Sequence, residues 1–176
     1  MIFVLTGPES TGKTTLANHF SRTYNAPLVE EYARTFLENL NRDYTITDVI
    51  EMASTQLKME QEAIKQNTSI LFLDTDLITY SIWLKVKYNT TIDWVDDAIS
   101  NQPNKHYFLC AIDVPWETDP LREHPNEKDR ETLFQLHLSL LEKHQYPYTI
   151  LSGSLDERIA KCKGTFEFIS NNQSTK

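Results

Sequence analysis

The residues most suited to chemistry lie near the start of the chain, where glycines, a lysine and threonines have the spacing of a phosphate-binding loop. Residues 7–14 fit the pattern G-x-x-x-x-G-K-[ST], with Lys13 at the lysine position. Glycines at the two fixed positions allow a tight turn that aims backbone N–H groups at an anion. We therefore predict that this P-loop binds the phosphates of ATP through Gly7, Pro8, Glu9, Ser10, Thr11, Gly12, Lys13, Thr14 and Thr15.

Two of these side chains have distinct predicted roles. The Lys13 ammonium group would reach the β- and γ-phosphate oxygens, and the Thr14 hydroxyl group would bind Mg²⁺. An apolar run at 2–5 is typical of a buried strand, and apolar residues recur at helical spacing over 16–24, which predicts a helix beginning near Lys13. Strand, loop and helix therefore occur in the order that the motif requires. The alternative is a turn between strand and helix that binds nothing.

Further apolar runs of strand length predict the rest of a sheet. They lie at 70–74, 107–113 and 147–151, with a shorter run at 27–30. Because these runs are continuously apolar rather than alternating, they are typical of parallel strands that are covered on both faces. We therefore predict a three-layer α/β/α fold around a five-stranded parallel sheet.

Helical spacing occupies the intervals between these strands. Apolar residues share one face over 50–64, with Thr47 as the expected N-cap, and another face over 133–141. The segment 154–157 has the pattern of a capping box, which predicts the start of the last helix.

Ligands of parallel α/β sheets bind at the carboxyl ends of the strands, which selects the polar residues that follow each strand. After the second predicted strand come Glu30, Glu31 and Arg34, which we predict to bind substrate. Glu31 is well placed to accept a proton from an attacking hydroxyl group, and Arg34 to bind a phosphoryl oxygen or to brace Glu31. The alternative is an acidic first turn of a helix, which the helix dipole favours.

The third predicted strand ends in Asp74, Thr75 and Asp76. An acid directly after such a strand is the expected Mg²⁺ partner in a P-loop protein, and we assign this role to Asp74. Three roles are open to Asp76, which could hold a substrate hydroxyl group, act as the base, or cap the next helix. Trp83 follows and could stack on an aromatic substrate ring, with core packing as the alternative.

A polar, proline-rich segment after the fourth predicted strand predicts a mobile loop. If it closes over a nucleotide as a lid, over about 116–130, Arg122 and Arg130 would place guanidinium groups on the transferring phosphoryl group. The alternative is a solvated charged loop. After the fifth predicted strand, Ser152 and Gly153 could present backbone groups to an adenine ring, although a turn that contains glycine needs no ligand.

Length and cysteine content limit the organisation of the chain. The 176 residues fit the usual size of one domain, and no linker or internal repeat is found. We therefore predict a single domain over 1–170, followed by a polar tail over 171–176. Two isolated cysteines, Cys110 and Cys162, make neither a disulfide framework nor a zinc site.

Charge and hydropathy exclude several partners. The net charge is −8 and the isoelectric point is near 5.1, whereas nucleic-acid binding needs clustered Lys and Arg, so we expect no nucleic-acid partner. No run approaches the ~20 apolar residues of a membrane helix, and the first run is too short for a signal peptide, so we expect a cytoplasmic protein. The five histidines lack metal-ligand spacing, so we expect no metal other than Mg²⁺.

Several of these segments together resemble the ribosylnicotinamide kinase domain of NadR-type proteins, which are P-loop kinases close to the nucleoside and nucleotide kinases. The resemblance rests on the P-loop and on 31–34, 73–76, 114–122 and 147–154, and it covers nearly the whole chain. It implies transfer of the γ-phosphoryl group of ATP to the 5′-hydroxyl group of nicotinamide riboside, which gives nicotinamide mononucleotide. A kinase for another nucleoside or nucleotide, or a regulatory module that hydrolyses ATP, is the alternative.

Within this resemblance Glu31 is the favoured base, with Asp76 as a reserve base or a ligand of a ribose hydroxyl group. One departure is Glu30, which stands where we expect proline or an aromatic residue in relatives. An acidic side chain there would attract a cationic pyridinium ring. The bifunctional relatives carry an adenylyltransferase domain before this one, and because this chain begins at the P-loop we expect neither that activity nor DNA binding.

Overall fold

The computed structural model describes residues 1–102 and 105–173. Its strands form one five-stranded sheet in the order β2-β3-β1-β4-β5, and every neighbouring pair is parallel. The predicted parallel sheet is therefore confirmed, with β1 at its centre. The strands are β1 (Ile2–Thr6), β2 (Leu28–Val29), β3 (Leu71–Asp74), β4 (Lys105–Cys110) and β5 (Tyr148–Leu151).

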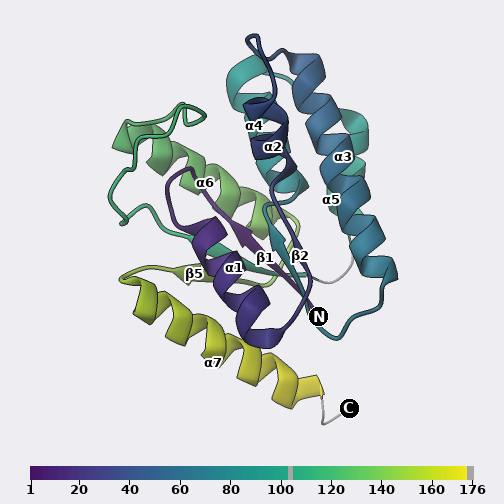
Figure 1. Ribbon diagram of the computed structural model, residues 1–176, viewed down its shortest axis with the longest axis vertical. Coiled ribbons are helices and arrows are strands. Elements are labelled where there is room, and N and C mark those ends of the chain that lie inside the picture. Colours follow the sequence, from purple (N-terminus) through teal and green to yellow (C-terminus); the bar gives the residue numbers. More distant parts are fainter. Residues whose placement is uncertain (103–104, 174–176) are drawn as a thin grey trace.

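Helices cover both faces of this sheet (Figure 1). Buried side chains of α1 and α7 pack on one face, and those of α2 to α6 pack on the other, which confirms the three-layer α/β/α prediction. The helices are α1 (Lys13–Tyr24), α2 (Tyr32–Glu38), α3 (Ile46–Lys65), α4 (Leu77–Tyr88), α5 (Asp93–Ser100), α6 (Glu127–Lys143) and α7 (Leu155–Gln173).

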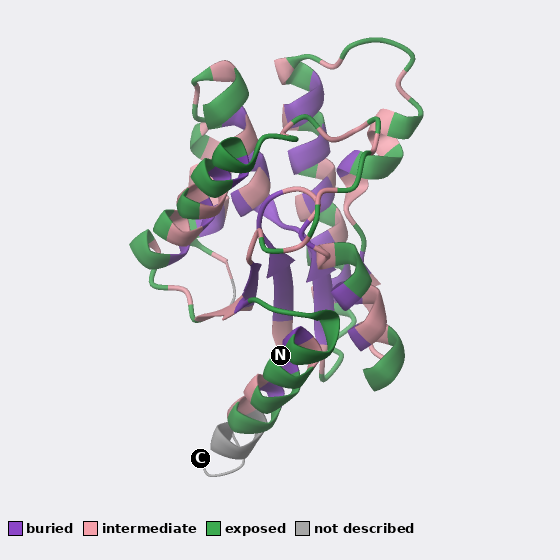
Figure 2. Ribbon diagram, turned by 90° about the vertical axis from the view of Figure 1, so that its left-hand side faces the viewer, coloured by how far each residue is buried: buried purple, intermediate pink, exposed green. Residues whose placement is uncertain are grey.

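The core beneath α1 and α7 is largely aromatic. The Phe3 ring on β1 lies between the rings of Phe72 on β3 and Phe108 on β4, with centroids 5.8 and 5.7 Å away. From α7, Phe166 meets Phe3 edge-on at 4.5 Å. Side chains alternate along a strand, so Val4 enters the opposite core. Figure 2 shows the result, in which the strands are almost entirely buried and the exposed residues lie on outer helix faces and loops.

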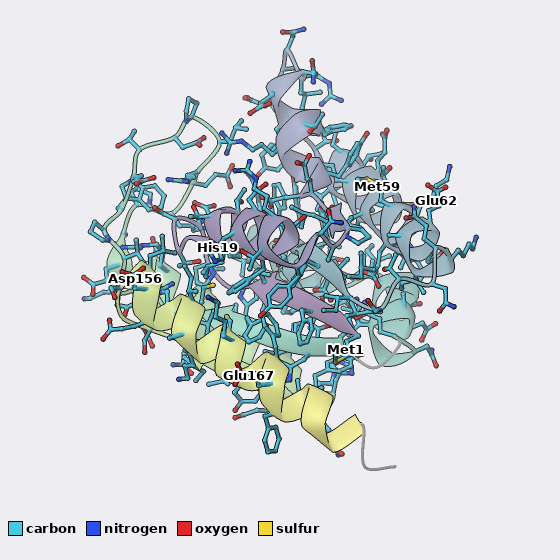
Figure 3. The ribbon with its side chains drawn as sticks, turned by 60° about the horizontal axis from the view of Figure 1, so that its bottom comes forward. Met1, His19, Met59, Glu62, Asp156 and Glu167 are labelled. Carbon is cyan, nitrogen blue, oxygen red and sulfur yellow. The ribbon has the colours of Figure 1, made fainter. Side chains whose placement is uncertain are left out.

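The inner face of α7 repeats every four residues. Arg158, Cys162 and Phe166 are buried at this spacing, as a helix of 3.6 residues per turn requires. Asp156 and Glu167, which Figure 3 labels along α7, are exposed. The helix therefore joins the aromatic core at one end to an arginine near the carboxyl ends of the strands at the other.

Capping side chains explain where two helices start. The prediction of Thr47 as the N-cap of α3 is wrong, because α3 begins after Thr45. Only Thr45 has an acid three residues later, and its backbone N–H donates to the Asp48 carboxylate at 2.7 Å. The capping box predicted before α7 is confirmed, since the Ser154 N–H donates to Glu157 at 2.7 Å.

The polar segment after β4 ends earlier than predicted. Helix α6 begins at Glu127, with Asn126 as its N-cap, whose side chain accepts a hydrogen bond from the Lys128 N–H at 2.9 Å. The last residues of the predicted lid at 116–130 are therefore helical, and Arg130 lies in the first turn of α6.

Two other boundaries differ from the sequence prediction. The fourth strand occupies 105–110 rather than 107–113, because the chain leaves the sheet where β5 ends beside it. Helix α7 continues into the predicted polar tail as far as Gln173, and residues 174–176 lie outside the described part. No helix in the described part is long and apolar enough to cross a membrane.

A buried ion network fixes the turn that follows β3. The Lys105 side chain is completely buried, and its Nζ lies 2.8 Å from Glu60 on α3 and 3.2 Å from Asp76 at the start of α4. The Tyr107 hydroxyl group also donates to Asp76, at 2.6 Å. The network thereby joins β4 to α3 and to the start of α4, two residues after Asp74.

Replacing Lys105→Met is expected to lower the free energy of unfolding by about 3–5 kcal/mol, because it leaves two carboxylates buried without their cation. The measurement is urea unfolding followed by circular dichroism. Lys58→Met, on the exposed side of α3, makes the same chemical change and is expected to stay within about 0.5 kcal/mol of the parent protein. Equal stability of the two variants would contradict this role of Lys105.

Candidate active site

A single cleft at the carboxyl ends of the strands contains most of the predicted site residues. Its volume is about 840 Å³, which suits a ligand of the size of a nucleotide with a small acceptor. All nine predicted phosphate-binding residues, 7–15, line it. The rest of the lining comes from α2, α4, α6, the start of α7 and the segment after β4.

The P-loop is a tight turn that only glycine permits at its closest contact. Gly7 has a φ of 129°, and a Cβ atom there would lie 2.8 Å from the Cys110 carbonyl oxygen. Gly12, with a φ of 81°, is the N-cap of α1, which begins at Lys13 as predicted. The Lys13 ammonium group donates to the Pro8 carbonyl oxygen at 2.8 Å. The first turn of α1 carries no acidic residue, so its positive end can act on an anion in the cleft.

Glu31 faces this positive end from the start of α2. It is the N-cap residue of α2, yet its side chain makes no capping hydrogen bond and lines the cleft instead. Burial raises the pKa of Glu31, Lys13 and Arg34 lower it, and Asp74 raises it again, with a net upward shift. A half-buried carboxyl group within electrostatic reach of cations and with a raised pKa has the properties of a general base.

Asp74 lies behind the P-loop rather than in the cleft lining. It is 2% exposed, and its Oδ1 atom has no hydrogen-bond partner in the described part of the chain. Burial raises its pKa, while the Thr14 side chain and the Lys13 charge oppose that shift. An unpartnered carboxylate oxygen beside a threonine hydroxyl group fits a hard cation such as Mg²⁺, which prefers oxygen ligands.

Asp76 has the capping role among the three that the sequence left open. Its Oδ1 accepts a hydrogen bond from the Ile78 N–H at 3.1 Å, and its Oδ2 accepts from Lys105 and Tyr107. The side chain is fully buried and does not line the cleft. Both carboxylate oxygens are therefore bonded within the fold, and a role of Asp76 as reserve base or substrate ligand stays a prediction.

Two further predicted residues lie apart from the cleft. Glu30 is exposed, and it contributes to the fold through its backbone carbonyl oxygen, which accepts a hydrogen bond from Gln56. Ser152 is also exposed and does not line the cleft, although the neighbouring Gly153 does. The Glu30 charge still reaches the site, because it raises the pKa of Asp74, and its place beside a pyridinium ring stays a prediction.

Residues 111–126 form a covering segment that is bonded to the P-loop. The Glu9 carboxylate accepts hydrogen bonds from the Glu123 N–H at 2.9 Å and the His124 N–H at 3.2 Å, and lies 3.0 Å from His124 Nδ1. Burial alone would raise the pKa of Glu9, but the bonds from His124 lower it overall. The bond to Glu9 in turn raises the pKa of His124. When His124 is protonated, the two side chains form an ion pair between the P-loop and the covering segment.

Two more ion pairs hold the covering segment to the helices. Arg34 on α2 lies 2.9 Å from Asp119, and Lys87 on α4 lies 2.6 Å from Glu123. The Tyr44 hydroxyl group donates to the same Glu123 carboxylate at 2.7 Å. The segment therefore contacts the P-loop, α2 and α4, which are three walls of the same cleft.

The two predicted lid arginines both lie against the Trp116 ring. The guanidinium carbons of Arg122 and Arg130 are 5.8 and 5.4 Å from its centroid. Arg122 lines the cleft and donates to the Ser10 hydroxyl oxygen at 3.2 Å. Arg130 is buried and does not line the cleft, and two of its nitrogens have no partner among the described residues. Of the pair, Arg122 is the one that lines the cleft, and the catalytic roles of both arginines stay predictions.

Sequence reasoning missed an arginine that joins the three loops at this edge. Arg158 is 2% exposed, and it donates to the carbonyl oxygens of Thr11 at 2.8 Å and Gly153 at 3.0 Å, and also pairs with Asp113. The sequence contains a signal for it, since Arg158 is in phase with the apolar residues of α7. A charged residue at a core position of a helix needs a polar partner.

Part of the cleft lining, contributed by α2, α4 and α6, is apolar. Trp83, which the sequence predicts as a substrate contact, lines it, and its Nε1 is held by a hydrogen bond to the Tyr44 hydroxyl oxygen at 3.0 Å. A flat apolar ligand group would therefore find a complementary wall. Other apolar side chains in the lining are Leu37 of α2, Ile82 and Val86 of α4, and Leu133 of α6.

The sheet order and the loop after β1 place the chain in the class of P-loop α/β proteins. A model of a family described as an AAA domain matches residues 2–158. The chain belongs to this family.

Comparison with individual proteins narrows the similarity. Over 161 residues the chain is 25% identical to the trifunctional NAD biosynthesis/regulator protein NadR of Escherichia coli (strain K12). The alignment covers 89% of this chain but only 39% of the NadR protein. The chain therefore spans about two fifths of the length of this relative.

Solved structures share the fold. A NadR protein in complex with NR has a TM-score of 0.73 and 23% identity, covering 94% of this chain and 48% of that one. Deoxyadenosine kinase from M. mycoides with bound dATP has a TM-score of 0.61 and 16% identity, and the match covers 95% of this chain and 99% of the kinase chain. The fold is therefore that of the P-loop kinases.

The pair formed by Glu9 of the P-loop and His124 of the covering segment predicts that the stability of the contact between these segments depends on pH. Because the pKa of His124 is raised in the folded protein, the stability that its protonated form contributes is fully present below about pH 6.5, its usual pKa. This stability is lost as the pH rises through the raised pKa. Because the pKa of Glu9 is lowered in the folded protein, the stability that its carboxylate contributes is lost only as the pH falls through that lowered pKa. An NMR titration should give His124 a pKa above 6.5 in the parent protein and a lower one in Glu9→Gln. An unshifted His124 in the parent protein would contradict the pairing.

Proposed function

We propose that this chain is an ATP-dependent kinase that phosphorylates the 5′-hydroxyl group of nicotinamide riboside to give nicotinamide mononucleotide. The observation that carries the proposal is that Glu31 and the P-loop line the same cleft, so that a base and a phosphate site share one space. Similarity to NadR, and the NadR structure that holds NR, support this acceptor. The match to that structure covers 94% of this chain and 48% of the NadR chain.

The P-loop would hold the phosphates of ATP. Its backbone N–H groups and the first turn of α1 would bind phosphate oxygens, and Lys13 would exchange its bond to the Pro8 carbonyl oxygen for one to the β- and γ-phosphates. Phosphoryl transfer depends mainly on positioning and on stabilising negative charge, which are the two properties that this arrangement supplies.

Glu31 would act on the acceptor. Its raised pKa suits it to take the proton from the 5′-hydroxyl group as that oxygen attacks the γ-phosphorus. The neighbouring charges of Lys13 and Arg34 oppose the effect of burial and so favour the ionised form that a base needs. Arg122, on the covering segment, would add positive charge and exclude water.

Mg²⁺ would be held by Thr14 and Asp74. The unpartnered Oδ1 of Asp74 supports this assignment, because a buried carboxylate oxygen without a hydrogen bond is otherwise unfavourable. When bound, the ion neutralises charge on the β- and γ-phosphates.

The location of the protein in the cell stays an expectation from sequence.

A kinase for another nucleoside is the second candidate, which the shared fold of deoxyadenosine kinase favours. We expect ADP release to require an added acceptor, and nicotinamide riboside to give a higher kcat/KM than thymidine, uridine or AMP. A higher kcat/KM for one of the other acceptors would show that the proposed acceptor is wrong, while the proposed kinase activity would stand. Hydrolysis of ATP that no acceptor accelerates would instead indicate a regulatory module.

In the same assay Lys13→Ala should lower kcat by a factor of about 10²–10³ or more, because it removes the charge that stabilises the transferring phosphoryl group. The matched control is Lys163→Ala on the exposed side of α7, which should keep parent activity. An active and folded Lys13→Ala protein would refute the role of the P-loop.

The variant Glu31→Gln distinguishes a catalytic role of Glu31 as the base from a structural role of this residue in the fold. We expect kcat to fall by about 10²–10⁴ with little change in the KM for ATP, since only the proton acceptor is removed. Because burial disfavours the ionised form of Glu31, the neutral amide should leave the melting temperature unchanged or raise it. A variant with parent kcat, or one that has lost both activity and stability, would argue against Glu31 as the base.

A further inference from the structure

A histidine and a threonine in the cleft remain without a role in the reaction proposed above. His137 on α6 and Thr79 in the first turn of α4 both line the cleft, from two different elements. They lie on the same side as the apolar residues Ile82 and Leu133, where a flat acceptor ring would pack. His137 is 2% exposed, so its hydrogen-bonding capacity is set by the fold rather than by solvent.

The fold selects one tautomer of His137. Nδ1 lies 2.9 Å from the Leu133 carbonyl oxygen, which can only accept, so Nδ1 must carry the hydrogen. In the neutral ring, Nε2 is then an acceptor alone. Its partner is the Thr79 hydroxyl group at 3.4 Å, which is near the outer limit of a hydrogen bond. A ligand donor at ordinary distance would form a better bond.

The surroundings keep the ring neutral. Burial lowers the pKa of His137 to about 4, and although the Leu133 carbonyl group and Asp76 act in the opposite direction, Lys13 adds to the effect of burial. The influence of Lys13 also shows that the ring lies within electrostatic reach of the phosphate site. At neutral pH the cleft therefore presents a hydrogen-bond acceptor without charge, beside a hydroxyl group that is free to turn.

We propose that His137 and Thr79 select an acceptor that carries an uncharged carboxamide over one that carries a carboxylate. The amide N–H would donate to Nε2 of His137, and the Thr79 hydroxyl group would turn to donate to the amide oxygen. A carboxylate offers no hydrogen, so its lone pairs would face the lone pair of the neutral Nε2 atom. This inference rests on the proposed kinase function and names what sets its acceptor specificity.

The test compares nicotinamide riboside with nicotinic acid riboside, its carboxylate analogue, in the ADP-release assay. The parent protein should prefer the amide by about tenfold or more in kcat/KM, the value of one well-made hydrogen bond. His137→Gln should bring the ratio towards one, because a glutamine side chain can donate to a carboxylate as well as accept from an amide. His144→Gln, at the end of the same helix and outside the cleft lining, should keep the parent ratio.

A second pair of variants does not depend on the folding of the histidine variant. Thr79→Val should lower kcat/KM for the amide by about tenfold relative to Thr79→Ser, which keeps the hydroxyl group. Phosphorylation of both acceptors with equal kcat/KM by the parent protein, or a parent-like ratio in a folded His137→Gln protein, would overturn the inference and leave the kinase intact. If the parent protein phosphorylates neither acceptor, the proposed function fails and the inference fails with it.

Discussion

The central constraint on this molecule is the placement of positive charge within electrostatic reach of two carboxyl groups whose pKa is raised by burial. The P-loop collects backbone N–H groups, the end of α1 and the Lys13 ammonium group at one point. Glu31 and Asp74 lie close enough for Lys13 to lower the pKa of each, while burial shifts both upwards. The carboxyl groups are not fully satisfied within the fold, because Asp74 Oδ1 has no partner in the described part of the chain. A triphosphate with a divalent cation has charges that complement both the cationic and the acidic groups.

The rest of the structure keeps this arrangement in place. The aromatic core around Phe3 positions α1, and the buried Lys105 network holds the turn that carries Asp74. Arg158 binds the P-loop to the segments that follow β4 and β5. The covering segment is bonded to the P-loop through Glu9, so that closure of the cleft and the geometry of the phosphate site are linked. Each of these contacts joins elements that are distant in sequence.

Much of the fold is predictable from the sequence because its signals are local. Continuous apolar runs indicate buried parallel strands, and the P-loop has a fixed spacing. The contacts of the covering segment are not predictable in this way, since Glu9 and His124 are 115 residues apart and no short pattern connects them. The role of Asp76 depends on Lys105, which belongs to another strand, so the sequence leaves that role open. Residues 7–15 and Glu31 do come together in one cleft, and their chemical roles stay predictions.

The most direct test of the central claim is a crystal structure with Mg²⁺ and a non-hydrolysable ATP analogue. The account predicts that phosphate oxygens lie about 3 Å from the P-loop N–H groups and from Lys13 Nζ, which has left the Pro8 carbonyl oxygen, with the metal ion between Thr14 and Asp74. A nucleotide bound elsewhere, or one bound in the cleft while Lys13 still donates to Pro8, would contradict it.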